Sequence, residues 1–335
     1  MNRNSFDYEP SFPIVRMRRL RRNASIRDLF QETHVSVRDL VCPIFVQEGI
    51  KAPVNVESMP DIKRIPLTNL VDEIQDIIDL GIRGIIIFGI PSRKYASANS
   101  AYSNEGIVQH SIKIVRENFV DKVAIISDVC LCQYTTHGQC GLVSNGKVDN
   151  DKSIGILGKV ALSHAKAGVD IVAPSAMMDG QVGHIRKILD ENGFSDVAIM
   201  GYSAKHASAL YAPFRDASSS VPRNGDRTSY QLPFHNRREA IREIELDIKE
   251  GADIVMIKPA IPYLDIIYQA RKITNLPICA YSVSGEYSLI KAAATQGWID
   301  EDNLIMEFLT SIKRAGSDII ISYHAKKMAA LLKIS

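Results

Sequence analysis

Short apolar stretches recur along the chain, and within them polar and apolar residues do not alternate. Strands of this kind are buried on both faces, as in the parallel sheets of α/β proteins. The pattern predicts eight such strands, at residues 41–46, 84–89, 123–129, 169–175, 197–203, 253–259, 277–283 and 318–323.

Helical periodicity separates most of these strands. In residues 69–81, the apolar side chains of Leu70, Ile74 and Ile77 fall on one helical face. The same spacing predicts helices at 153–168, 236–251, 263–273 and 301–316. Asn236, with Glu239 three residues later, predicts an N-terminal capping box, and the acidic start of the last helix is a second start signal.

A weak internal repeat supports the alternation of helices and strands. "AGVDIVAPS", "EGADIVMIKP" and "AGSDIIISY" share a helix end, a glycine, a spacer, an aspartate and a strand. The glycine suits a left-handed helix stop before a tight turn. Eight buried strands alternating with helices predict an α/β fold, a single (β/α)8 TIM barrel. The rival is an open doubly wound sheet, which usually carries a glycine-rich phosphate turn after its first strand; none follows residues 41–46.

Composition narrows the choice of partners. The chain has 335 residues, 40 basic and 38 acidic, so its net charge of +2 gives no general attraction to nucleic acid or membrane. No stretch approaches the ~20 apolar residues of a membrane span, and the N-terminus lacks a secretory signal, so a cytoplasmic location is expected. The basic run 16–22 favours an arm that pairs with acidic surface on its own or a neighbouring subunit, with nucleic-acid binding and organellar import as the alternatives.

Lysines stand at the ends of two predicted strands, where the chemistry of a barrel collects. Lys258 directly follows "DIVMI", and burial there lowers the pKa and frees a neutral amine that attacks a ketone to form a Schiff base. The alternatives are a phosphate clamp or an ammonium that reaches water. Lys205 lies just beyond the neighbouring strand, and two ammonium groups at one mouth lower each other's pKa.

The segment 212–234 is predicted to be irregular and to form a lid over this mouth. It carries Arg215 and Arg227, whose guanidinium groups suit bidentate binding of carboxylates. The alternative is two solvated surface arginines. Above an amine pair, a lid of this kind favours a keto-acid substrate.

Cys130, Cys132 and Cys140 fall within eleven residues. A disulfide between residues two apart is strained, and a redox pair is more often C-x-x-C. Three thiolates bind zinc and leave a fourth position open, which is typical of catalytic sites, whereas His137 as a fourth ligand would make the site closed and structural. Cys42 and Cys279 lie inside apolar strands and are expected in the core.

Several long motifs in collinear order, from about Arg16 to near the C-terminus, resemble the porphobilinogen synthase (5-aminolevulinate dehydratase) family. They are "SDVCLCQYTTHGQCG", "APSAMMDG", "GYSAKHASALYAPFRDA", "YQLP", "VMIKPAIPYLDI", "YSVSGEY" and "KRAGSDIIISY". The resemblance implies residues 1–35 as an arm for subunit contacts, usually in a homo-octamer. It implies residues 36–335 as a barrel that joins two molecules of 5-aminolevulinate into porphobilinogen, in tetrapyrrole and heme biosynthesis, with loss of two waters.

The same resemblance assigns roles to single positions. It implies Schiff bases on Lys205 and Lys258, and a zinc-type site at the three cysteines. The substrate-binding residues that it implies are Arg215, Arg227, Ser284, Tyr323, Tyr281, Asp128, Ser175, Phe214 and Gln231. Some bacterial members hold an activating magnesium through a glutamate matching Glu239, although a glutamate at a helix start needs no ion. "KPA" replaces the "KPG" of many members, which should not affect the imine.

Two other functions are compatible with parts of the sequence. A class I aldolase needs one Schiff-base lysine, usually binds phosphate and needs no thiolates. A zinc-stabilised scaffold or nucleic-acid binder would use the basic arm and a closed metal site. Two lysines at strand ends argue against such a scaffold.

Overall fold

The computed structural model describes residues 12–223 and 225–334. Residues 1–11 of the predicted arm, residue 224 of the predicted lid and residue 335 lie outside the described residues. The chain divides into a small unit, Met1–His34, and a large unit, Val35–Ser335.

The small unit contains a 3-10 helix, η1 (Met17–Arg21), and a short helix, α1 (Ala24–Leu29). Asn23 caps α1 by accepting a hydrogen bond from the backbone N–H of Ile26. Neither helix buries a side chain, and the basic run is exposed. The exposed apolar side chains of the small unit include Ile14, Met17, Leu20, Leu29 and Phe30. The described part of this unit therefore has no hydrophobic core of its own.

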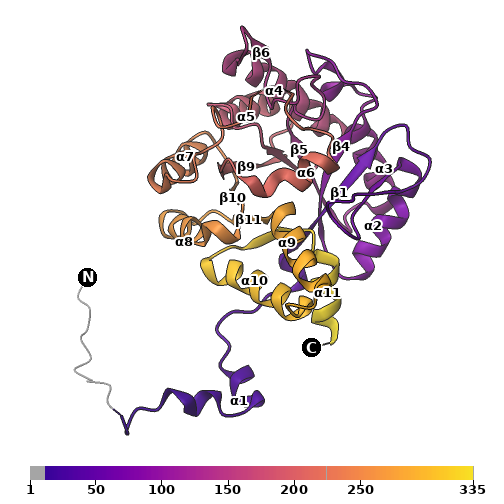
Figure 1. The fold of residues 1–335 in the computed structure, drawn as a ribbon. Helices are drawn as coiled ribbons and strands as arrows, with labels where there is room; N and C mark the ends of the chain where they lie inside the picture. The colour runs from indigo at the N-terminus through magenta and orange to yellow at the C-terminus, as the bar shows by residue number, and fades with distance from the viewer. Residues whose placement is uncertain (1–11, 224, 335) are drawn as a thin grey trace. The chain divides into compact units, whose positions relative to one another are not determined.

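In the large unit, eight parallel strands close into a barrel (Figure 1). They are β1 (Leu40–Gln47), β4 (Gly84–Ile90), β5 (Ala124–Val129), β8 (Ile171–Pro174), β9 (Ala198–Lys205), β10 (Ile254–Lys258), β11 (Ile278–Ser282) and β12 (Ile319–Ser322). Pairing of Leu40 with Ile320 joins the first strand to the last, so the open doubly wound alternative is wrong. All eight predicted strands and the barrel are confirmed.

Four short strands lie outside the barrel proper. β3 (Lys63–Ile65) pairs with the end of β1 and with β2 (Val54–Asn55), while β6 (Val143–Ser144) and β7 (Lys147–Val148) form a hairpin before α4.

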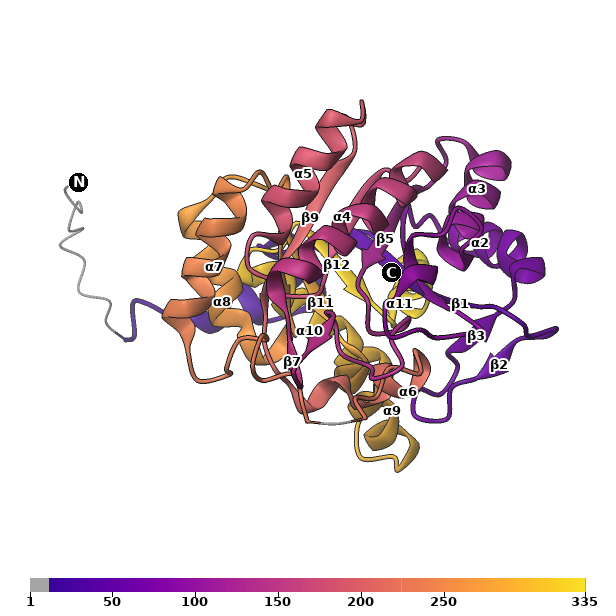
Figure 2. The same cartoon turned by 90° about the horizontal axis from the view of Figure 1, so that it is seen from above.

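Helices alternate with the strands and surround them (Figures 1 and 2). They are α2 (Leu70–Asp79), α3 (Ile107–Phe119), α4 (Asn150–Ala167), α5 (Gln181–Glu191), α6 (Ala212–Ala217), α7 (Arg237–Lys249), α8 (Leu264–Ile273), α9 (Ser284–Thr295), α10 (Glu301–Ala315) and α11 (Ala325–Ile334). The five predicted helices are confirmed. No described helix has both the length and the apolar character that a membrane span requires.

The internal repeat has a physical explanation at the N-terminal face of the barrel. The glycine has a positive φ in all three copies, 100°, 98° and 121° at Gly168, Gly251 and Gly316, which confirms the predicted helix stop. The aspartate that follows accepts a hydrogen bond from the start of the adjacent strand. The donors are the N–H groups of Ile125 to Asp170 (2.7 Å), Ile199 to Asp253 (2.8 Å) and Ile278 to Asp318 (2.7 Å). Each repeat therefore fixes one strand against its neighbour.

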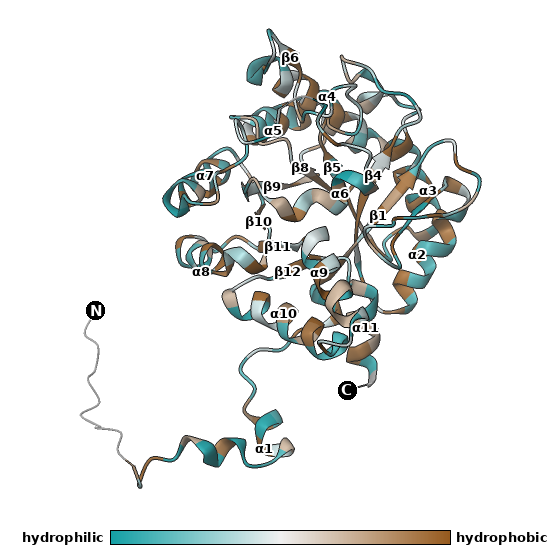
Figure 3. Cartoon of the chain, in the orientation of Figure 1, coloured by the Kyte–Doolittle hydropathy of each residue, from teal (hydrophilic) through white to brown (hydrophobic). Residues whose placement is uncertain are grey.

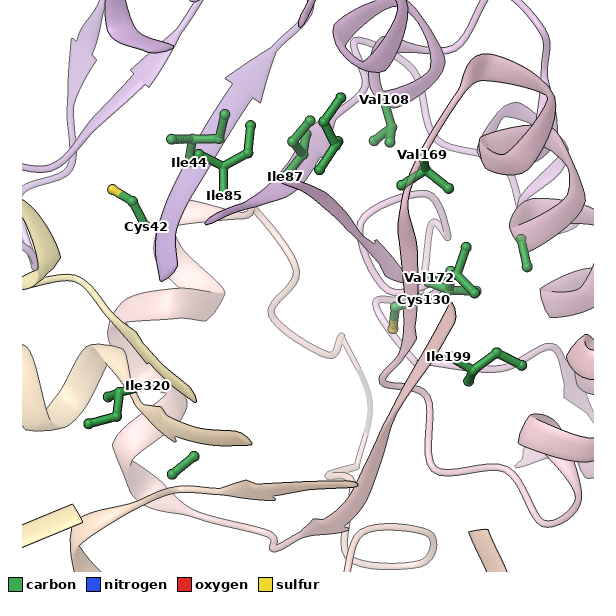
Figure 4. Packing of buried hydrophobic residues seen from close by; sticks show 14 of the residues in the cluster. Cys42, Ile44, Ile85, Ile87, Val108, Cys130, Val169, Val172, Ile199 and Ile320 are labelled. Atoms are coloured by element: carbon green, nitrogen blue, oxygen red, sulfur yellow. The ribbon is translucent and has the colours of Figure 1, made fainter. Parts of the chain in front are cut away.

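Buried side chains form two layers. One lies between strands and helices, and Figure 4 shows part of it, including Ile85 and Ile87 of β4 and Val172 of β8. The other fills the barrel and is rich in aromatic rings, among them Phe45, Phe88, Tyr202, Tyr281 and Tyr323. In Figure 3 the strands are mainly hydrophobic, whereas polar residues mark the outer helices. The polar site described below is thus built into an apolar interior.

Two local predictions need correction. Asn236 makes no capping bond to the backbone of α7; its side-chain amide instead donates to the Glu239 carboxylate (2.8 Å). The predicted lid is not irregular throughout, because residues 212–217 form α6 with a proline in its first turn. By contrast, Asp300 accepts from the Asn303 N–H (2.8 Å) and caps the last predicted helix as expected.

Candidate functional site

Lys205 and Lys258 end two neighbouring strands and are paired in register across β9 and β10. Their side chains are 5% and 4% exposed, so both amines are buried at the C-terminal face of the barrel. The expectation that the two lysines share one mouth is therefore confirmed by the register.

A β-bulge turns Lys205 into the barrel. Val255 pairs with Gly201 and Ile257 pairs with Ala204, so β9 has one more residue than β10 between these pairs. Before the bulge, Tyr202 points into the barrel, whereas after it Ala204 packs in the outer layer. Because side chains alternate along a strand, this extra residue places Lys205 on the inner face.

Four aromatic rings surround the Lys258 amine. Its Nζ lies 4.3 Å from the ring centroid of Tyr281, 5.1 Å from those of Tyr202 and Phe214, and 5.2 Å from that of Tyr211. The Tyr202 ring also lies 5.4 Å from the Nζ of Lys205. Rings at these distances stabilise a cation, and they also exclude water from the amine.

Burial is the main influence on the pKa of the free Lys258 amine. The pKa of Lys258 falls from 10.5 to about 7, first because of burial and second because of the neighbouring Lys205 charge. The Lys205 amine donates to the backbone carbonyl of Ser175 on the β8 side of the mouth. Lys258 is therefore a neutral nucleophile in a large fraction of molecules near neutral pH.

Asp128, at the end of β5, is a buried carboxyl group beside both lysines. One oxygen accepts from the Gln133 amide (3.3 Å), while the other is buried and has no hydrogen-bond partner among the described residues. Burial raises the pKa of Asp128, and the nearby Ser175 hydroxyl and the two lysine charges oppose that shift. A carboxyl group of this kind suits proton transfer.

The three cysteines of the loop after β5 converge on one point. Their sulfur atoms all lie within 4.8 Å of one another, with 3.4 Å between those of Cys130 and Cys132. All three are buried free thiols, so the disulfide reading is wrong. Hydrogen bonds from the other two thiols hold the pKa of Cys140 well below its ordinary value, whereas hydrogen bonds to Cys132 and Cys140 raise that of Cys130. Three converging buried sulfurs are a donor set that fits zinc.

His137 does not join this group. Among the described residues, the three cysteines are the only set of three ligand atoms within that distance, and His137 Nδ1 instead accepts from the Gln139 N–H (3.1 Å). The geometry therefore favours three sulfur ligands over a closed site with His137.

The lid and the cysteine loop interlock. Arg223 N–H donates to the His137 carbonyl (3.1 Å), and Arg227 donates to the carbonyls of Gly138 (2.9 Å) and Ser220 (2.7 Å). A Cβ atom on Gly138 would lie 2.6 Å from the Val221 carbonyl oxygen. The hydroxyl of Tyr230, another lid residue, accepts from the Cys140 N–H (3.2 Å). The two segments pack so closely that a disturbance in one must reach the other.

The lid also brings unused donors to the site. The Nε groups of Arg215 and Arg227 and the side-chain amide of Gln231 are buried and have no hydrogen-bond partner among the described residues. Burial lowers the pKa of Arg215, and the charge of Arg227 lowers it further, so the two guanidinium groups lie close enough to repel. For Arg227, burial likewise lowers the pKa, but nearby Cys140 and Cys132 outweigh it and the pKa rises. A carboxylate between these donors would satisfy both charge and hydrogen bonding.

A second polar wall lies beside Lys258, at the ends of β11 and β12 and the start of α9. Tyr281 OH lies 3.0 Å from Tyr323 OH and donates to it, which leaves the Tyr323 proton free to be donated elsewhere. Ser284 Oγ accepts from the Phe214 N–H (3.0 Å) and donates to the Leu210 carbonyl (3.1 Å). Ser284 therefore also fixes the root of the lid.

Glu239 lies in the first turn of α7, and the cavity that it lines is also lined by Tyr202 and Gln231. It lines a cavity of about 480 Å³ together with further carboxylates, namely Asp179, Glu243, Asp247 and Glu250. Burial raises the pKa of Glu243 and, to about 7, that of Asp247. Glu239 does not belong to a converging set of three ligand atoms within the described residues.

Sequence reasoning missed three site residues. Tyr202 lies between the lysines, Tyr211 donates its hydroxyl to the Lys258 carbonyl (3.1 Å), and Tyr230 contacts the cysteine loop. The signal available was weak: a tyrosine inside an apolar strand three residues before Lys205, and two tyrosines flanking the lid arginines.

Known proteins resemble the chain along almost its whole length. The family model for delta-aminolevulinic acid dehydratase matches residues 14–331. A delta-aminolevulinic acid dehydratase of Archaeoglobus fulgidus is 53% identical over 96% of this chain and 99% of its own length. That of Bacillus subtilis is 48% identical over 95% of this chain and 98% of its own.

A solved structure extends the likeness to three dimensions. Delta-aminolevulinic acid dehydratase (porphobilinogen synthase) from Toxoplasma gondii, in complex with the reaction product porphobilinogen, is 40% identical, with a TM-score of 0.92. The match covers 95% of this chain and 91% of the other. With this fold, this pair of lysines and these relatives, the chain belongs to the delta-aminolevulinic acid dehydratase family.

Proposed function

We propose that the chain is a lyase that condenses two molecules of 5-aminolevulinate into porphobilinogen, through Schiff bases on Lys258 and Lys205. The observation that carries this proposal is the pair of buried lysines in register at the ends of neighbouring strands. Two amines at one mouth match a reaction that joins two ketones, and the Toxoplasma relative binds porphobilinogen.

Lys258 acts first on one substrate molecule. Its neutral amine attacks the ketone carbon, water leaves, and a protonated imine forms. The aromatic rings around the Nζ of Lys258 stabilise the positive charge of this imine. Lys205 forms the second imine in the same way, and a second water leaves.

The two bonds of the product then form between the bound molecules. The carbon beside the Lys205 imine loses a proton and bonds to the imine carbon on Lys258. The free amine of the Lys258-bound molecule bonds to the imine carbon on Lys205. Both lysine amines leave, and loss of further protons completes the pyrrole. Asp128, with its unpartnered buried oxygen, and Ser175 stand where protons must move.

The carboxylates of the two substrates bind at different walls. Arg215, Arg227 and Gln231 on the lid supply the unused donors for one carboxylate. The free hydroxyl proton of Tyr323 serves the other, with Tyr281 and Ser284 orienting it. Phe214, on α6, closes the aromatic cage when the lid is seated and keeps water from the imine.

Cys130, Cys132 and Cys140 would hold a zinc ion, which supplies a Lewis acid that polarises a substrate oxygen. Glu239, by resemblance, would hold an activating magnesium in the acidic cavity beside α7. Residues 1–35 would act as the arm that joins subunits in a homo-octamer, and the enzyme would work in the cytoplasm. For these points the family resemblance is the main support.

The test is porphobilinogen formation from 5-aminolevulinate, read by its colour with an aldehyde reagent, with and without a zinc chelator. We expect activity that is lost with the chelator and restored by zinc. Activity that survives complete zinc removal would keep the reaction and make the cysteine site structural. No product under any metal condition, together with cleavage of a sugar phosphate, would replace the proposal by the aldolase function.

A further inference from the structure

Glu286 is a buried carboxylate that the reaction outlined above does not use. It lies in the first turn of α9 and is 3% exposed. Both of its oxygens accept backbone hydrogen bonds. Oε2 accepts from the Val283 N–H (2.5 Å), and Oε1 accepts from the Ile261 N–H (2.6 Å).

The two N–H donors lie in segments that follow two different strands, Val283 after β11 and Ile261 after β10. The bond to Val283 is half of a capping box at the start of the helix that contains Glu286. In such a box on the protein surface the second oxygen faces water, whereas here it binds the loop that follows β10. Ile261 is only three residues beyond Lys258. One carboxylate thus ties the segment after the nucleophilic lysine to the end of β11.

The segments that Glu286 joins carry the groups around the Lys258 amine. Val283 is two residues from Tyr281, whose ring is the closest of the four to Nζ at 4.3 Å. It also precedes Ser284, which holds the root of the lid. On the other side, the Lys258 carbonyl accepts from the His206 N–H (2.9 Å), which anchors it to the segment after β9.

We propose that Glu286 is a positioning residue that fixes the Lys258 amine against Tyr281 and the Ser284–Tyr323 wall. Both oxygens accept short backbone hydrogen bonds, and the burial that raises the pKa of Glu286 to about 7 also protects these bonds from competition by water. The inference rests on the proposed Schiff-base chemistry, because it concerns how one imine-forming amine is aimed. Lys205 is held separately, by the bulge in β9 and by the Ser175 carbonyl, and does not depend on Glu286.

The test is Glu286→Gln, which keeps size and shape but replaces one acceptor oxygen by an NH2 group that faces a backbone N–H. The enzyme is incubated with 5-aminolevulinate and borohydride, which adds hydride to the imine carbon and locks the substrate on the lysine. Mass spectrometry of peptides then measures labelling at Lys258 and at Lys205. We expect the rate at Lys258 to fall roughly 10- to 100-fold, as for a buried backbone N–H left without its acceptor, with Lys205 unchanged.

Asp253→Asn is the matched control. Asp253 precedes β10, the strand of Lys258, and its carboxylate also accepts from a backbone N–H, that of Ile199, but at the opposite end of the barrel. We expect this variant to lose stability without any change in the labelling of either lysine. Glu286→Asp provides a second test if the glutamine variant does not fold, because its shorter side chain cannot reach both N–H groups.

Each outcome decides the inference. Selective loss at Lys258 supports it, whereas normal labelling at Lys258 overturns it. Equal loss at both lysines in folded protein also overturns it, because Glu286 would then only support the fold. If the wild-type enzyme labels neither lysine, the proposed function itself fails, which the wild-type sample reveals before any variant is compared.

Discussion

Replacing Lys258 by methionine should stabilise the folded protein while abolishing turnover. Lys258 is an amine buried in the barrel, and burial lowers its pKa from 10.5 to about 7, with the Lys205 charge as the second cause. Methionine has a similar length, carries no charge and suits the aromatic cage. The substitution therefore removes the cost of placing an amine there and keeps most of the packing.

The size of the effect follows from linkage between protonation and folding. The pKa difference between the unfolded and folded states is 10.5 − 7 = 3.5. At ~1.4 kcal/mol per unit, this destabilises the wild type by about 5 kcal/mol. The full cost is present below pH 7, where lysine is protonated in both states. It shrinks as pH rises from 7 to 10.5, to about 3 kcal/mol at pH 8, because only the unfolded state still binds the proton.

The assay is urea unfolding of both proteins at several pH values. Circular dichroism is the better probe, because the single tryptophan, Trp298, is 78% exposed and reports poorly on the core. Lys272→Met is the matched control: Lys272 also lies over an aromatic ring, that of Tyr268 at 4.1 Å, but on the surface. We expect a gain for Lys258→Met that narrows as pH rises, and little change for the control. A less stable variant, or a gap independent of pH, would refute the reasoning.

Three further predictions concern the site. The rate of borohydride labelling at Lys258 should rise about tenfold per pH unit below pH 7 and level off above it, because only the neutral amine reacts. Lys205→Met should move the midpoint of this pH profile to higher pH, because it removes a charge that lowers the pKa of Lys258. An unchanged midpoint would contradict the role of the Lys205 charge. Cys140→Ser, or removal of zinc, should speed proteolysis within the lid, since the Cys140 N–H, Gly138 and the lid are bonded together; equal cleavage rates would mean that lid and cysteine loop are independent. Arg215→Lys keeps the positive charge but loses the bidentate geometry. In initial-rate measurements of porphobilinogen formation, KM should therefore rise roughly 10-fold or more, with a smaller change in kcat. An effect on kcat alone would instead place Arg215 in the chemical step.

The N-terminal face of the barrel illustrates what a repeated motif can predict. The glycine–spacer–aspartate pattern predicted helix stops, which the structure confirms. The partner of each aspartate was not predictable, because its hydrogen bond goes to a strand that lies about 40 to 54 residues away in the chain. Asn236 shows the opposite failure, since a local capping pattern was present but its side chain bonds to Glu239 instead.

Local patterns in the sequence determined the eight buried strands, the main helices and the lysine that ends each of two strands. These features depend on periodicity over a few residues, which short-range sterics and burial enforce. The clustering of Cys130, Cys132 and Cys140 was equally readable, because all three lie in one loop.

Only the tertiary structure decided where the reactive groups point. Lys205 would face the helices without the extra residue in β9, and a bulge depends on the register with β10 rather than on local sequence. The cage around Lys258 combines rings from β9, β11 and the segment around α6, and Glu286 joins two loops that no local pattern connects. The lowered pKa of Lys258 arises from this assembly, because burial and a neighbouring charge act through space and not along the chain.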